Sequence, residues 1–92
     1  MRIELKFENG LSRLAGNIFG EKIFREQVKD YIDYKNKIII KFPEYIKDVA
    51  ISFVQGFTNE ILKNIDKSEF REYFEIEGNE KVVNKFIKSI YY

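Results

Sequence analysis

Ser52 is the residue of this chain whose position best fits a chemical role. It follows a β-branched run (KIIIKF, residues 37–42), the single proline and a short loop, and it opens an apolar stretch with helical spacing. Gln55 stands three residues later, so the pair fits a Ser-x-x-Gln capping box. A serine at a helix start, just beyond the end of a strand, lies among free backbone N–H groups at the positive end of the helix dipole. This position predicts a site for a regulatory phosphate, a bound anion or a partner's carboxylate.

Two plainer interpretations of Ser52 stay open. The residue can be a helix cap and nothing more, a role worth about 1 kcal/mol. Asp48 is a rival cap, and a helix beginning there would place Ser52 one turn inside it.

The other polar residues give little support for catalysis. The chain has no Cys and no His, which excludes thiol chemistry and the usual zinc sites. Its closely spaced glutamates lie among lysines, whereas a general acid–base pair needs a desolvated pocket. The segment 16–22 lacks the spacing of a phosphate loop, and close packing against the sheet is expected to explain its glycines. We therefore expect a protein that is not an enzyme and that uses no cofactor or metal.

Composition limits the partners. The 92 residues carry 16 basic and 15 acidic side chains, a net charge of +1, which argues against a dedicated nucleic-acid binder. No apolar run reaches 18 residues, so no membrane insertion is expected and the cytoplasm is the expected compartment.

The elements that must position Ser52 follow from hydrophobic spacing. Residues 2–7 alternate, which predicts a strand with one buried face. Residues 11–32 have helical spacing in two stripes that are offset near Gly16 and Gly20. Either one helix with a weak middle or a short helical turn followed by a longer helix starting near Gly20 fits this pattern. The run 37–42 is continuous, as in a central strand covered by helices on both faces.

The second half of the chain continues the alternation of strands and helices. A helix is expected over residues 52–65, a strand over 73–76 and a last helix over 82–90 after a turn and cap at Gly78 and Asn79. The order β-α-β-α-β-α predicts a single α/β domain over residues 1–92, with a small, largely parallel, single-layer sheet of three to four strands.

The segment from Lys37 to Ile65 resembles STAS-like domains. The parts that carry the resemblance are KIIIKF, then PEYIKDVAI, then Ser52-Phe53 and Gly56-Phe57. These domains are small α/β modules related to anti-sigma factor antagonists, and the chain is most similar to short bacterial STAS-like proteins of unknown function. The resemblance implies that Ser52 is a phosphorylation switch beside a surface that docks a kinase-like anti-sigma factor. Ile51 stands where the antagonists carry an acidic residue, and Lys41 where the STAS-like proteins tend to carry Asp.

The sequence therefore predicts a non-enzymatic regulatory module that binds another protein. Its expected surface is the loop 43–55 with the start of the Ser52 helix, and the expected partner-binding residues are Tyr45, Lys47, Asp48, Ile51, Phe53 and Gln55. The expected partner is a kinase-like anti-sigma ATPase. One alternative is an anti-CRISPR-like inhibitor, encoded by a phage or mobile element, that blocks a host defence complex. Another is a nucleotide or anion sensor at the same helix start. A homo-oligomer is also open, because the first strand is expected at a sheet edge.

Overall fold

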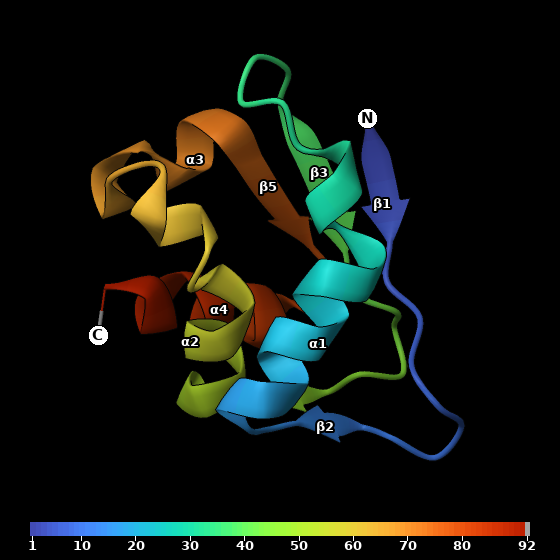
Figure 1. Cartoon of the computed structure of the whole chain (residues 1–92). Helices are drawn as coiled ribbons and strands as arrows, with labels where there is room; N and C mark the ends of the chain where they lie inside the picture. The colour runs from blue at the N-terminus through green and yellow to red at the C-terminus, as the bar shows by residue number, and fades with distance from the viewer. Residues whose placement is uncertain (92) are drawn as a thin grey trace.

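Three strands form a parallel sheet in the computed structural model, which describes residues 1–91 (Figure 1). They are β1 (Arg2–Glu4), β3 (Ile38–Lys41) and β5 (Phe74–Glu77), in the order β1-β3-β5. Ile3 pairs with Ile40, and Ile40 pairs with Ile76. The β-branched run is therefore the central strand and the first strand lies at an edge, as the sequence predicts.

A second, two-stranded parallel sheet was not predicted. It consists of β2 (Arg13–Leu14) and β4 (Asp48–Val49). The helices are α1 (Asn17–Gln27), α2 (Ile51–Thr58), α3 (Phe70–Tyr73) and α4 (Glu80–Ile90). The predicted α/β class and the main order β1, α1, β3, α2, β5, α4 are confirmed. Within residues 1–91, no helix is long and apolar enough to cross a membrane.

The two faces of the larger sheet differ in polarity. On one face Ile38, Ile40, Phe74 and Ile76 are buried against the helices. On the other face no side chain is fully buried, and Arg2 reaches across β3 to Glu77 at 2.6 Å. The expectation that helices cover both faces of β3 is therefore wrong. A short run of β-branched residues does not by itself distinguish a central strand buried on one face from one buried on both.

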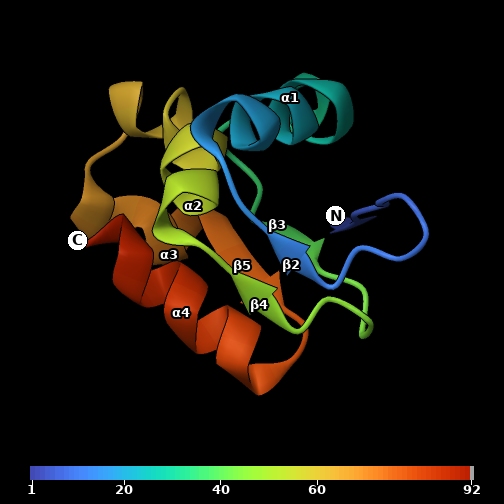
Figure 2. The same cartoon turned by 90° about the horizontal axis from the view of Figure 1, so that it is seen from below.

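Aromatic rings join the sheet to the helices. The ring of Phe42, just after β3, lies 5.7 Å from that of Phe86 in α4 and 6.4 Å from that of Phe53 in α2. Phe57 adds contacts at 5.9 Å to Phe53 and 5.7 Å to Phe86. Figure 2 shows α2 between α1 and α4. This cluster fixes where α2 begins relative to the sheet.

Two helix boundaries differ from the prediction and one agrees. Residues 11–16 are not helical, so the single helix over residues 11–32 and the short helical turn before Gly20 are both wrong. The helix predicted to start near Gly20 is present as α1, and it begins at Asn17. Helix α2 ends at Thr58 and a separate 3₁₀ turn covers Ile61–Lys63, so the helix expected over residues 52–65 is interrupted. Asn79 caps α4 as predicted, because its Oδ1 accepts a hydrogen bond from the Lys81 N–H at 3.0 Å.

Candidate docking site at the paired helix starts

The two-stranded sheet brings the starts of α1 and α2 together. Strands β2 and β4 run parallel, and each leads within two residues into a helix. The Ala50 N–H donates to the Leu14 carbonyl at 2.7 Å, which joins the segments that lead from the two strands into the helices. The positive ends of both helices therefore emerge side by side at one edge of the molecule.

Ser52 links the two helices directly. Its Oγ accepts a hydrogen bond from the Gly16 N–H at 2.8 Å, in a partly buried contact. Gly16 precedes α1 with a φ of 101°, a conformation that favours glycine. The Ser52 side chain is half-buried. Its hydroxyl hydrogen is not used in this bond and is available to donate a second hydrogen bond.

The predicted capping role of Ser52 is wrong. The cap position of α2 is Ala50, which has no side-chain acceptor, and Ser52 is the second residue of the first turn. The Ser52–Gln55 capping box is consequently absent. Asp48 is not the cap either, because it lies in β4. The serine still lies at the start of α2, but it binds the backbone of the residue that precedes the neighbouring helix.

Two glycines allow α1 and α2 to pack backbone against backbone. A Cβ atom on Gly20 would stand 2.2 Å from the Phe53 carbonyl oxygen, and one on Gly56 would stand 2.1 Å from the Asn17 carbonyl oxygen. No larger residue fits at either position without moving a helix. The expectation that Gly20 packs against the sheet is therefore wrong: its neighbour is α2.

Apart from Asp48, the predicted partner-binding residues fall into three groups in the structure. Ile51 and Gln55 lie on α2 beside Ser52, half-buried and exposed respectively. Tyr45 and Lys47 are exposed but precede β4, and the Tyr45 hydroxyl donates to the Phe7 carbonyl at 3.3 Å. Phe53 is 0% exposed. A partner cannot reach Phe53 in the folded protein, so that prediction is wrong; the residue belongs to the aromatic core.

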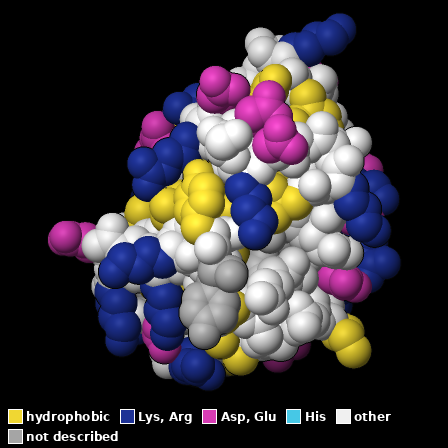
Figure 3. Space-filling view, turned by 90° about the vertical axis from the view of Figure 1, so that its left-hand side faces the viewer, with side chains coloured by type: hydrophobic (Ala, Val, Ile, Leu, Met, Phe, Trp, Pro, Cys, Tyr) yellow, Lys and Arg dark blue, Asp and Glu magenta, His cyan; other side chains and the backbone are white. Residues whose placement is uncertain are grey.

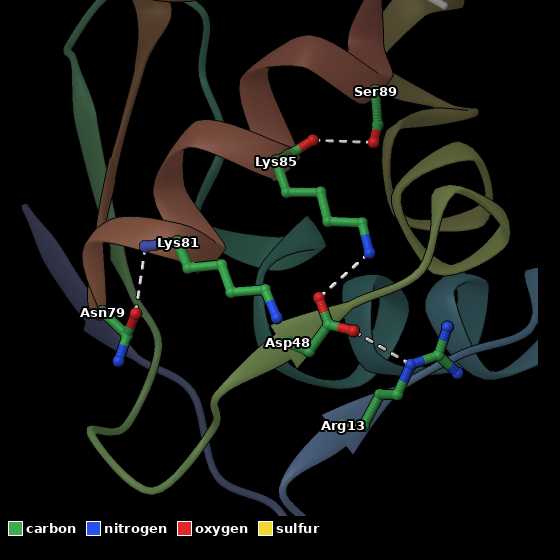
Figure 4. Close-up of polar contacts among 6 residues, drawn as sticks. All are labelled: Arg13, Asp48, Asn79, Lys81, Lys85 and Ser89. Carbon is green, nitrogen blue, oxygen red and sulfur yellow. Dashed lines mark hydrogen bonds and ion pairs between the residues drawn. The ribbon is translucent and has the colours of Figure 1, made fainter.

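Asp48 is held in a network of cations next to this edge. Lys85 Nζ lies 3.0 Å from Asp48 Oδ1, and Arg13 Nε lies 3.0 Å from Oδ2 (Figure 4). The hydrogen bond from Lys85, then that from Arg13 and the nearby charge of Lys81, lower the pKa of the Asp48 carboxyl below its usual value. Since Lys85 comes from α4 and Arg13 from β2, the carboxylate connects three elements and acts as a structural tie.

Sequence reasoning missed Ile18. It is the second residue of α1 and is 82% exposed. An isolated apolar residue in a helical stretch is usually assigned to a buried stripe, so only the late start of α1 reveals that it faces solvent. We define the helix-start face as Asn17, Ile18, Ile51, Ser52 and Gln55.

The electrostatic character of the helix-start face is positive. Neither α1 nor α2 has an acidic residue in its first turn. The leading N–H groups of both helices are therefore not neutralised by a side chain of their own helix, which favours a carboxylate or phosphate. Within residues 1–91 no group of three or more acidic side chains is placed to hold a metal ion.

Comparison of the chain with protein-family models, with curated proteins and with solved structures found no match.

Proposed function

We propose that this protein is a STAS-like interaction module that docks an acidic segment of another protein on the helix-start face. The observation that carries the proposal is the 2.8 Å contact of Ser52 with Gly16, which holds two helix N-termini side by side. An exposed isoleucine next to unneutralised N–H groups offers one apolar contact and one anion contact in a single surface. Such a combination suits a peptide with a carboxylate beside an aliphatic side chain.

The same geometry gives Ser52 a regulatory role in this proposal. Phosphorylation adds about two negative charges and strong acceptor oxygens. Placed between the two helix starts, the phosphate would take the N–H groups that otherwise bind the partner's carboxylate. A phosphorylated Ser52 is therefore expected to release an acidic partner, and a kinase-like anti-sigma factor is the partner type that the STAS-like resemblance suggests.

The test captures proteins from the native host on immobilised wild type and two variants. Ile18→Asp puts a carboxylate into the first turn of α1, where the helix dipole favours it by about 0.3–1 kcal/mol, so the fold is kept while an acidic partner is repelled. Tyr31→Asp, at a residue that is 56% exposed near β1, is the matched control. We expect a protein that binds wild type and Tyr31→Asp but is lost on Ile18→Asp. Equal capture by all three would overturn the proposed face.

The phosphorylation step is tested separately with the captured kinase and ATP. An intact mass raised by one phosphate, and lost in Ser52→Ala, supports the switch. An unchanged mass would contradict the phosphorylation of Ser52 and would not affect the proposed docking face. Inorganic phosphate alone, added in a thermal-shift assay, tests the anion-sensor alternative, since a bound anion raises the melting temperature by mass action. No shift over a phosphate titration excludes that alternative.

A further inference from the structure

Three lysines follow one another along one face of α4. They are Lys81, Lys85 and Lys88, and their spacing of four and three residues places them in a row about 10 Å long. The three side chains line one surface depression of about 550 Å³ together with Glu80 and Asn84. Figure 3 shows basic side chains gathered at its lower left, over α4. We call these three residues the lysine row.

Neighbouring carboxylates neutralise only part of the lysine row. Within residues 1–91, Lys81 and Lys88 make no ion pair. Lys85 binds Asp48, which Arg13 also binds, yet the Lys85 side chain is still 38% exposed and has further N–H groups to donate. Figure 4 shows Lys81 pointing toward the same carboxylate. Asp48 therefore holds the middle of the row in position without satisfying the charge of the whole row.

The lysine row borders the helix-start face at two places. Asp48, which lies 3.0 Å from Lys85 Nζ, is three residues before the start of α2. Farther along α4, Ser89 follows the last lysine of the row and lines one pocket together with Gln55 of the helix-start face. The two positively charged surfaces are therefore continuous.

We infer that the acidic segment docked on the helix-start face continues along α4, where its further carboxylates bind Lys81, Lys85 and Lys88. This inference rests on the proposed function, since it concerns the same acidic partner. It adds that the segment carries several carboxylates within about 10 Å, the length of the row. Hydrogen bonds between ammonium and carboxylate groups are stronger than neutral ones, and a row of like charge also speeds the encounter with a partner of opposite charge.

The surroundings of the lysine row favour an acidic polypeptide over a nucleic acid. A nucleic-acid site usually combines a long basic track with aromatic side chains on which bases stack. The whole chain has a net charge of only +1, so its positive charge is confined to short patches. None of the described residues that line the depression is aromatic, and Glu80 lies among them. The exposed Ile18 on the adjoining helix-start face also suits an aliphatic side chain of a polypeptide.

The test uses fluorescence anisotropy with a labelled oligoglutamate of about ten residues, which spans about 33 Å when extended and so reaches both surfaces. Low ionic strength is chosen because salt screens exposed charges. The lysine-row variant combines Lys81→Gln with Lys88→Gln and leaves the contact of Lys85 with Asp48 in place. We expect this variant to bind oligoglutamate about fivefold more weakly than the wild type, or weaker still.

The control variant combines Lys22→Gln with Lys35→Gln. Both lysines are exposed, and both lie outside the lysine row and the helix-start face. Because the control has the same net charge as the lysine-row variant, it separates the local effect of the row from the overall charge of the protein. It is expected to bind oligoglutamate like the wild type, and an equal loss in both variants would overturn the inference.

Ile18→Asp distinguishes failure of this inference from failure of the proposed function. Weaker binding in both Ile18→Asp and the lysine-row variant supports one segment that crosses both surfaces. A loss in Ile18→Asp alone overturns the role of the lysine row and keeps the helix-start face. A loss in the lysine-row variant alone overturns the helix-start face, and the continuous path with it. A wild type that does not bind oligoglutamate, or that binds an oligothymidylate of the same length more tightly, overturns the choice of an acidic polypeptide.

Discussion

Replacing Gly56 with alanine tests whether α1 and α2 are in backbone contact. The added Cβ would stand 2.1 Å from the Asn17 carbonyl oxygen, and real Cβ atoms essentially never come within 3.0 Å of such an atom. The helices would have to separate by about 1 Å, which loses packing along their whole crossing. In an unconstrained helix the same change would stabilise the protein by about 1 kcal/mol. The structure therefore predicts that Gly56→Ala destabilises the protein instead.

We expect Gly56→Ala to lower the free energy of unfolding by about 2 kcal/mol, and the melting temperature by about 8–16 °C for a domain of this size. Urea denaturation followed by circular dichroism measures the first quantity, and thermal denaturation the second. Gln55→Ala is the control, since this neighbour is exposed on the same helix and its change should stay within about 0.5 kcal/mol. A Gly56→Ala protein as stable as wild type, or more stable, would refute the close crossing and with it the joined helix starts.

Three further substitutions probe single contacts. Ser52→Ala removes the acceptor of the Gly16 N–H, so we expect a loss of about 1 kcal/mol in urea denaturation; no loss would mean that the contact is absent in solution. The pKa of Asp48 is held below 3.8, chiefly by the hydrogen bond from Lys85, so its stabilising contribution is present above pH 3.8 and is lost as the pH falls through the lowered pKa. Denaturation curves across that range should show a smaller acid loss in Asp48→Asn than in wild type, and equal losses would contradict the assignment. Asn79→Ala removes the cap of α4 and should cost about 1 kcal/mol in the same measurement, whereas an unchanged midpoint would show that the cap is dispensable.

Strong local signals in the sequence were interpreted correctly. The alternation at the N-terminus predicted a strand, the β-branched run predicted the central strand, and Asn79 predicted the start of α4. In each case the residues that specify the element lie within it, so spacing and capping chemistry suffice.

The candidate site was harder to predict because it depends on contacts between distant residues. Strands β2 and β4 are two residues each and pair Arg13 with Asp48, far along the chain, which leaves no periodic pattern to detect. Ser52 was placed correctly at the beginning of a helix, but its hydrogen-bond partner is Gly16 on another element. Phe53 was assigned to the partner surface because the resemblance marks its neighbourhood. The aromatic rings that pack against it come from distant parts of the chain, among them Phe19 in α1 and Phe42 after β3.

The most direct test of the helix-start face is amide chemical-shift mapping with ¹⁵N-labelled protein and the captured acidic partner. We expect the largest shifts at Gly16, Asn17, Ile18, Ile51 and Ser52, because their N–H groups lie at the two joined helix starts. Unchanged signals for these amides, with the shifts concentrated instead around β5 or on the polar face of the sheet, would contradict the account.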